Sequence, residues 1–253
     1  MAIDISKDLK KYIPIFQQAH DQSLNEAETS LRISKFFEEV LGYDVFNEIS
    51  REHVVKERNV DYAIKLDGKI RFFIEVKQAG IALKERHIEQ AENYAASAGI
   101  PWVLLTNGCQ WQLYHLTFDE GIEGNLIWTA DILAEDNKTA AEKLSLLHRK
   151  NILKDELDEY YAKFKTLSPR SIVQAMFHES TLRVLRTCLK HNTGVRVDEE
   201  ELVEHIKKMI SQDSWEQIGE VKVTRKRKAA RKPKEETAPI PVSQDQTAQG
   251  DKT

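Results

Sequence analysis

The 253-residue sequence predicts a mixed α/β domain that is followed by a helical extension and a basic tail. Three observations indicate this fold class. The hydrophobic pattern changes from helical spacing to strict alternation after Gly42. Three alternating segments, one helix and two further strands follow, up to about residue 132, which is typical of a sheet covered by helices. From residue 135 to about residue 211 the pattern is helical again.

Composition narrows the class of protein before any motif is considered. Charged residues make up 31% and hydrophobic residues 41%, as in globular proteins with a real core. No apolar run approaches the roughly 18 residues of a membrane span, and the polar start lacks the apolar stretch of a secretory signal. Cys109 and Cys188 form no CxxC pair, so neither a disulfide framework nor a structural zinc site is expected. We therefore expect a cytoplasmic protein without membrane association.

The N-terminal residues predict two helices. Residues 1–20 indicate a short helical lead-in that is broken at Pro14. Asn25 is a typical N-cap, with Glu28 three residues later, and Gly42 is a typical C-terminal stop. The buried stripe between them is expected to contain Ile33, Phe36, Phe37, Val40 and Leu41. Glu26 lies on the same side at the start of this helix, where its carboxylate would point towards the packing partner.

Alternation then predicts a three-strand meander over Tyr43–Ser50, Asn59–Leu66 and Ile70–Lys77. A two-residue loop between the last two strands would scatter apolar side chains over both faces. A three-residue loop, 67–69, collects them on one face, so we prefer it. In that register Asp61 lies directly opposite Glu75.

The remaining elements complete the predicted domains. Lys84–Ala98 is expected to be a helix, Trp102–Thr106 and Gln110–Leu116 a hairpin, and Leu126–Thr129 an edge strand. Helix starts are expected at Ser168-Pro169 and at Asp198, the latter with a capping box. We divide the chain into a sheet-containing domain over 1–134, a helical extension over 135–220 and a disordered basic tail over 221–253.

The central chemical signal is the pattern Asp61…Glu75-Val76-Lys77. Residues two apart in a strand share a face, so Glu75 and Lys77 point the same way. Two facing carboxylates repel each other, and a divalent cation would turn this repulsion into ligation. Carboxylates, the Val76 carbonyl and water are the hard oxygen ligands that Mg²⁺ prefers, and Mn²⁺ could substitute. Lys77 could then orient a water or stabilise the transition state. The alternative is an ordinary solvated charge pair, because an E-x-K pattern is common in strands.

At this point the sequence resembles a known family. The segments NEAETSLRISKFFEEVLGYDVF, RNVDYAIKLDGKIRFFIEVKQAG and IEQAENYAASAGIPWVLLTNGCQWQLYHL are similar to the N-terminal nuclease domain of type I restriction enzyme R subunits, within the PD-(D/E)xK superfamily. The resemblance covers residues 20–132 and implies a restriction-endonuclease-like core with a mixed central sheet flanked by helices.

The resemblance also implies roles for individual residues. Glu26 corresponds to the family's first-helix carboxylate, and Asp61 to the acid of its "PD" element. Glu75 and Lys77 correspond to its "ExK" element, and Gln90 and Tyr94 to its QxxxY element. Gln90 and Tyr94 are also four residues apart, so they share a helix face and would line the cleft. Alternatively, the Glu26 carboxylate could serve only to stabilise the N-terminus of its helix. Gln90 could be an ordinary surface amide, and Tyr94 a half-buried aromatic residue.

The sequence departs from the family pattern at two points, of which the first is frequent in the superfamily and the second is the more serious. Val60 replaces the proline of "PD", and the sequence contains no GxxxxGK[ST] phosphate loop. The chain therefore cannot be a complete ATP-driven R subunit. We expect a Mg²⁺-dependent DNA endonuclease without the helicase motor. The rival is a non-catalytic nucleic-acid-binding or adaptor protein that keeps the nuclease fold.

Charge is divided unevenly along the chain. Residues 222–253 hold nine basic and four acidic residues, a net charge of +5, whereas the remainder has a net charge of −9. The tail could bind nucleic acid, act as a solubilising end or bind a protein partner. The residues expected to contact DNA or RNA are Arg225, Lys226, Arg227, Lys228, Arg231 and Lys232. Residues 135–220 could contact a restriction-modification or other protein partner, or mediate homo-oligomerisation.

Overall fold

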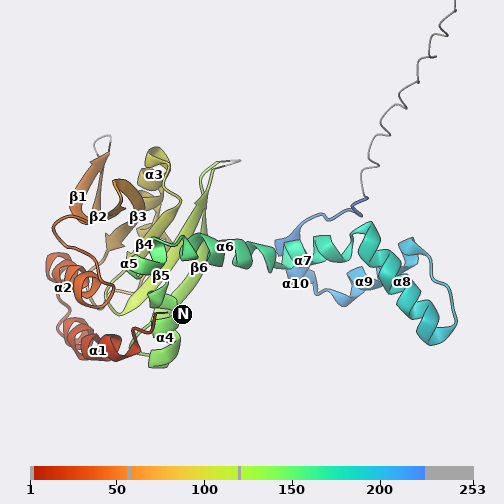
Figure 1. Cartoon of the computed structure of the whole chain (residues 1–253), viewed down its shortest axis with the longest axis horizontal. Coiled ribbons are helices and arrows are strands. Elements are labelled where there is room, and N and C mark those ends of the chain that lie inside the picture. Colours follow the sequence, from red (N-terminus) through yellow and green to blue (C-terminus); the bar gives the residue numbers. More distant parts are fainter. Residues whose placement is uncertain (1–2, 56–57, 119–120, 226–253) are drawn as a thin grey trace, which may run out of the picture. The chain divides into compact units, whose positions relative to one another are not determined.

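The computed structural model describes residues 3–55, 58–118 and 121–225 of the chain. They fall into two compact units that divide after Ser168 (Figure 1). The predicted end of the sheet-containing domain, residue 134, therefore lies inside the first unit. In the part of the chain described, none of the helices combines the length and the apolar character needed to cross a membrane.

The first unit is built on one six-stranded mixed sheet. Its strands, in both sequence and spatial order, are β1 (Ile49–Val55), β2 (Arg58–Leu66), β3 (Lys69–Val76), β4 (Trp102–Thr106), β5 (Gln110–Thr117) and β6 (Glu123–Asp131). Neighbouring strands are antiparallel except for β3 and β4, which are parallel. A parallel pair needs a crossover, and the chain between them forms η1 (Glu85–His87) and α3 (Glu89–Ala98). This confirms the predicted fold class of a mixed α/β core.

Helices cover both faces of the sheet and separate two apolar clusters. One face carries α1 (Ser6–Asp21), α2 (Glu26–Glu39), α4 (Asn137–Ser145), α5 (Arg149–Ile152) and α6 (Glu156–Thr166). The larger cluster lies under these helices and includes Phe36, Phe37, Phe72 and Trp111. The smaller cluster lies on the opposite face, where Ala91, Tyr94 and Ala95 of α3 pack against strand residues such as Phe73. Trp102 and Trp111 are buried core residues.

The predicted break at Pro14 is wrong, because α1 continues through this proline to Asp21. A proline inside a helix costs about 3 kcal/mol relative to alanine. Leu9, Tyr12 and Phe16 recur at helical spacing and are buried in the larger cluster. Their burial, at about 1.5–3 kcal/mol for each large apolar side chain, offsets the proline.

The predicted first strand is also displaced. Residues 43 and 44 have no regular structure, residues 45–48 form turns, and β1 begins only at Ile49. Asp44 accepts hydrogen bonds from the backbone N–H groups of Phe46 and Asn47, which favours a turn over an extended strand. Glu48 then forms a part-buried ion pair with Arg149, and the hydrogen bond from Arg149 lowers the pKa of the Glu48 carboxyl.

The predicted register between β2 and β3 is confirmed near the site and wrong near the turn. Tyr62 pairs with Ile74 and Ala63 with Phe73, as predicted. The connecting turn, however, has two residues, Asp67 and Gly68, both with positive φ as in a tight hairpin turn. A β-bulge after Ile64 restores the predicted register. The bulge thus places the apolar side chains on one face, an effect that had been expected from a longer loop.

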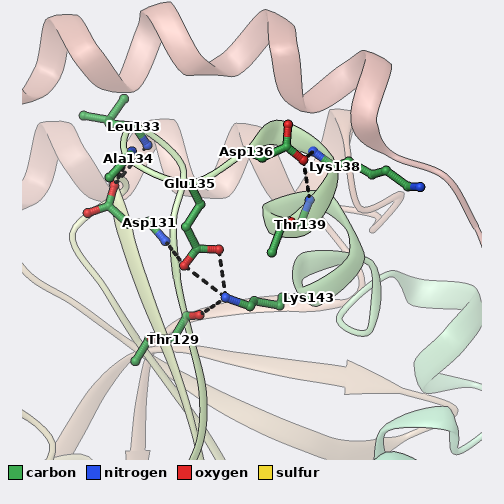
Figure 2. A network of polar contacts seen from close by, with 9 residues as sticks. All are labelled: Thr129, Asp131, Leu133, Ala134, Glu135, Asp136, Lys138, Thr139 and Lys143. Atoms are coloured by element: carbon green, nitrogen blue, oxygen red, sulfur yellow. Dashed lines mark hydrogen bonds and ion pairs between the residues drawn. The ribbon is translucent and has the colours of Figure 1, made fainter.

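A polar network fixes the connection between β6 and α4 (Figure 2). Lys143 of α4 donates to the backbone carbonyl of Thr129 at 2.7 Å and forms an ion pair with Glu135 at 2.8 Å. Asp131 accepts the N–H groups that follow β6, and Asp136 caps α4. These contacts, with the buried apolar face of α4, make the helix part of the first unit.

The second unit is helical. Its elements are α7 (Pro169–Met176), α8 (Glu179–Thr193), α9 (Glu199–Met209) and α10 (Gln212–Ile218), and a capping box at Asp198 starts α9 as predicted. Its core contains Phe177, Leu182, Val203 and Ile206. Val221 and Val223 pack against this core, and Thr224 pairs with the backbone at Phe177 and Glu179. The segment 221–225, which the sequence analysis assigned to the disordered tail, is thus part of the helical unit.

The two cysteines are free thiols in different surroundings. Cys109 is buried in the first unit, where its thiol donates to the Phe16 carbonyl at 3.4 Å. Burial, followed by the charges of Asp131 and Asp21, raises the pKa of the Cys109 thiol to about 12. Cys188 is exposed on α8 of the second unit.

Candidate functional site

Polar side chains gather where the two parallel strands end. Glu75 and Val76 close β3 beside Leu105 and Thr106 of β4. One residue further, the Lys77 N–H donates to the Thr106 carbonyl at 2.8 Å, so the chain leaving β3 stays fixed to β4. In sheets with parallel strands, ligands usually bind at the carboxyl ends of the strands. The location is therefore that of a functional site in this class of fold.

Three carboxylates from separate elements meet at this edge. Glu26 is the first residue of α2, Asp61 lies in β2, and Glu75 lies in β3. One oxygen from each lies within 4.8 Å of one oxygen from each of the others. We call these three residues, together with Lys77, the acidic cluster. From the strand pattern, Asp61, Glu75 and Lys77 were expected on one face, and Glu26 was added by the family resemblance; the structure brings the four side chains together, and their roles stay predictions.

The backbone of β3 fixes the Asp61 carboxylate. Its Oδ2 accepts a hydrogen bond from the Val76 N–H at 2.7 Å. The backbone pairing of β2 with β3 reaches Tyr62 and Ile74, and the Asp61 side chain continues the contact between the two strands beyond it. A backbone donor cannot move away without disrupting β3. The direction of the Asp61 carboxylate is consequently set by the sheet and not by a flexible neighbour.

Glu75 is a buried acid, with only 5% of the residue exposed. Burial raises the pKa of its carboxyl to about 7, and the charges of Asp61 and Glu26 act in the same direction. The hydrogen bond and charge of Lys77 oppose the rise without cancelling it. A carboxyl with this pKa gains from any added positive charge. Strongly shifted groups of this kind are typical of functional sites.

Lys77 joins two of the acids. Its ammonium donates to Glu75 Oε1 and lies 3.5 Å from Glu26 Oε1. The side chain is 21% exposed, so it can still meet a molecule arriving from solvent. Burial alone would lower the pKa of Lys77, but its bond to Glu75 and the charges of Glu75, Glu26 and Asp61 outweigh burial and raise it. Lys77 therefore stays charged at neutral pH.

The contacts that hold Glu26 over the sheet were not predicted from the sequence. The Thr29 hydroxyl, one turn into α2, is fully buried and accepts a hydrogen bond from the Ala79 N–H at 3.1 Å. The same N–H also lies 3.2 Å from the carbonyl of Leu24, just before α2. We call this pair of contacts the Thr29 staple. It ties the start of α2 to the loop that follows Lys77. A threonine at this point in a helix carries no sequence signal for such a contact.

Of the two predicted cleft residues, Tyr94 and Gln90, the structure describes the side chain of Tyr94. Tyr94 is 1% exposed, and its ring packs edge-to-face against Phe73 at 4.8 Å between centroids, inside the smaller apolar cluster. The side chain of Gln90 lies outside the described residues. Their role in lining a cleft stays a prediction. Burial, followed by the positive charges of Arg86 and Lys77, lowers the pKa of His87.

Of the six tail residues expected to bind nucleic acid, Arg225 is described, and it is exposed. Lys226, Arg227, Lys228, Arg231 and Lys232 lie outside the described residues. Their contact with nucleic acid stays a prediction.

The first unit thus has a mixed α/β core that is compatible with the expected nuclease-like class, and a helical unit follows it. Residues 35–125 match the family model of the type I restriction enzyme R protein N terminus (HSDR_N), which confirms the resemblance seen in the sequence. The match includes Asp61, Glu75 and Lys77, but neither Glu26 nor the helical unit. Neither the curated proteins nor the solved structures gave a match to the chain.

Proposed function

We propose that this protein is a Mg²⁺-dependent endonuclease that hydrolyses the phosphodiester bonds of DNA. The observation that carries the proposal is the acidic cluster: three carboxylates with oxygens within 4.8 Å of one another and an ammonium between two of them. The match of residues 35–125 to the restriction enzyme R family supports the choice of DNA as substrate.

The residues of the cluster fit a divalent cation. Asp61 and Glu75 would hold it, with the Val76 carbonyl as a further donor and Glu26 as an assisting carboxylate. Three negative groups this close destabilise one another unless a positive charge compensates them, and Lys77 supplies only one. All the donors are hard oxygens, which suits Mg²⁺ and also Mn²⁺. When bound, the cation would acidify a water and neutralise charge that develops on the phosphate.

The protein's own side chains would do the positioning. Asp61 is aimed by the Val76 N–H, and Glu75 is held in place by burial. The Lys77 ammonium would stabilise negative charge at the scissile phosphate, because it is partly exposed and already turned towards the acids. Gln90 and Tyr94 would shape the cleft on the α3 side.

A plasmid cleavage assay tests this proposal. In Mg²⁺ the native chain should nick or linearise the plasmid, whereas Lys77→Ala and Asp61→Asn should not. Asn at position 61 keeps an acceptor for the Val76 N–H, so the variant removes charge and not the fold. Lys69→Ala is the matched control, since Lys69 begins the same strand at the end away from the cluster and is exposed. If all four proteins bind DNA and none cuts it with Mg²⁺ or Mn²⁺, the non-catalytic adaptor is the better description.

The basic tail would add non-specific affinity for DNA. Truncation should begin after Arg225, because residues 221–225 belong to the helical unit. Each phosphate contact that the truncation removes should lower the slope of log affinity against log salt by about 0.9. An unchanged affinity and slope would refute a clamp made by the tail.

A further inference from the structure

The second unit carries a concentration of positive charge that the proposed nuclease site does not use. A cavity of about 350 Å³ is lined by Arg183, Arg186, Thr187, Lys190, Arg196 and Val197. We call it the basic groove. Four of its six lining residues are cations and none is acidic. It lies in the described part of the helical unit, separate from the tail that the sequence analysis singled out.

The helix geometry explains how the groove forms. Arg183, Arg186 and Lys190 are spaced i, i+3 and i+7 on α8, so they lie on one face of the helix. Gly194 ends α8 in the left-handed conformation, with φ of +76°, and the chain turns back. Arg196 joins the α8 cations from this returning segment. Arg186 also donates from Nε to the Val197 carbonyl at 2.8 Å, which orients its guanidinium.

The charge of the groove is not neutralised by the helical unit itself. Residues 169–225 contain nine basic and nine acidic residues, so the unit has no net charge. Four of the nine basic residues nevertheless line one groove that has no acidic lining residue, so the charges are segregated. The acids gather elsewhere, for example at Glu199, Glu200 and Glu201 in the first turn of α9. No carboxylate of the described residues lies within ion-pair distance of the four groove cations. A cleft lined by charges of one sign focuses the electric field and attracts ligands of the opposite charge.

We infer that the basic groove binds the phosphate backbone of DNA. Arginine presents a planar fork of N–H donors that matches phosphate oxygens, and three of the four cations are arginines. From residue 183 to residue 190 the helix rises about 10 Å, which is the axial length of roughly three nucleotides of one strand. Val197 is the one apolar residue among the six that line the groove, whereas a protein partner would need apolar or aromatic anchors.

The inference depends on the proposed function only for the choice of DNA. Phosphate contacts position a nucleic acid without reading its sequence. The groove would therefore hold DNA in a sequence-independent way, and cleavage would remain the task of the acidic cluster. Binding can be measured without Mg²⁺, so a failure at one site is separable from a failure at the other.

Fluorescence anisotropy with a labelled duplex of about 20 base pairs, in EDTA and over a series of salt concentrations, tests the inference. The full chain is compared with Arg183→Gln/Lys190→Gln, which leaves the bond of Arg186 to Val197 intact, and with a triple variant that adds Arg186→Gln. The control is Lys207→Gln/Lys208→Gln, which removes two charges from the same unit outside the groove. The groove double variant should bind at least about tenfold more weakly near 0.1 M salt, with a log–log slope lower by about two. The control should move the slope by less than half of that.

Two outcomes would overturn the inference. One is an equal effect of the groove and control variants, which would show that only total charge matters. The other is that polyglutamate competes as strongly as duplex DNA at equal charge, and that this competition is lost in the groove variants. That result would identify the groove as a surface for an acidic protein. If groove-dependent binding persists in EDTA but Mg²⁺ produces no cleavage, the groove stands and the nuclease proposal falls.

Discussion

The acidic cluster and the basic groove hold charge in opposite ways. The cluster collects Glu26, Asp61, Glu75 and Lys77 from three elements, and its central acid is buried. The groove takes three of its four cations from one helix, and most of them are exposed. Burial strengthens every charge interaction in the cluster, whereas solvent and salt screen the charges of the groove.

The difference in burial indicates which of the two sites is suited to catalysis. A buried carboxyl whose pKa is about 7, held by strand backbone, is costly for folding and is the kind of group that a reaction needs. Exposed cations on a helix cost little and attract any polyanion. We therefore assign bond cleavage to the first unit and attachment of DNA to the second.

The largest expected effect separates these two tasks. Lys77→Ala should lower the cleavage rate at least about 100-fold, because it removes the ammonium that we propose to stabilise the scissile phosphate. Its affinity for DNA in EDTA should stay within about twofold of the native value. Arg183→Gln/Lys190→Gln should do the reverse, with weak binding but a nearly native rate at saturating DNA. Single-turnover cleavage and anisotropy measure the two quantities, and a groove variant that loses the rate at saturation would contradict the division.

The next effect concerns stability and pH. Because the folded pKa of Glu75 is raised from 4.5 to about 7, the native state binds a proton more tightly than the unfolded chain. The free energy of unfolding should fall as pH rises from about 4.5 to about 7, because the buried Glu75 carboxyl becomes ionised. Above about pH 7 this loss of stability should not increase further. Glu75→Gln removes this cost and should be more stable than the native chain at pH 8 by up to about 3 kcal/mol.

Urea unfolding at pH 5 and pH 8, in EDTA, measures this prediction. The advantage of the Gln variant should be small at pH 5 and larger at pH 8. Saturating Mg²⁺ should stabilise the native chain and leave the variant nearly unchanged, because ligands that bind the folded state raise its stability. A variant that is less stable at both pH values would show that the Glu75–Lys77 contact outweighs the burial of the acid.

A smaller effect is expected at the Thr29 staple. Thr29→Val keeps the shape of the side chain but removes the acceptor of the Ala79 N–H, which should destabilise the protein by about 1 kcal/mol. Glu26 would also lose its fixed position, so cleavage should require more Mg²⁺. Thr166→Val is the matched control, because its hydroxyl only bonds the carbonyl of Ala162 within its own helix. Equal behaviour of the two variants in both measurements would rule out a positioning role.

The smallest effect is the stability of the groove variants. Arg183 and Lys190 are exposed and form no ion pair with the described residues, so Arg183→Gln/Lys190→Gln should change the free energy of unfolding by less than about 0.5 kcal/mol. Thermal unfolding checks this directly. A loss of several degrees would show that the groove has a structural role and would undermine its assignment to DNA.

The sequence was sufficient for the strand part of the acidic cluster, Asp61, Glu75 and Lys77, because strand alternation and register decide it, whereas Glu26 was assigned by the family resemblance. Tyr62 and Ile74 could be aligned from the apolar face alone, and that alignment brings Asp61 to Glu75. The turn was predicted wrongly because a bulge and a longer loop give the same register at the site. Local patterns cannot distinguish the two.

Other features depend on contacts between distant residues and could not be predicted. The helix through Pro14 persists because its buried face packs on the sheet, which overrides its propensity. Residues 45–48 turn instead of extending because Asp44 binds local N–H groups and Glu48 pairs with Arg149, 101 residues later. The groove did leave a signal in the i, i+3, i+7 spacing of Arg183, Arg186 and Lys190, but Arg196 joins it only through the fold.

The unequal accessibility of the two cysteines has a practical use. A maleimide dye added to the native chain should react at Cys188, since Cys109 is buried and its thiol has a pKa of about 12. Cys188 lies on the same helix as the groove cations but two positions from Arg186 and Lys190, so its side chain points away from their row. The unmutated protein thus offers one spectroscopic reporter close to where the duplex would dock, without blocking it.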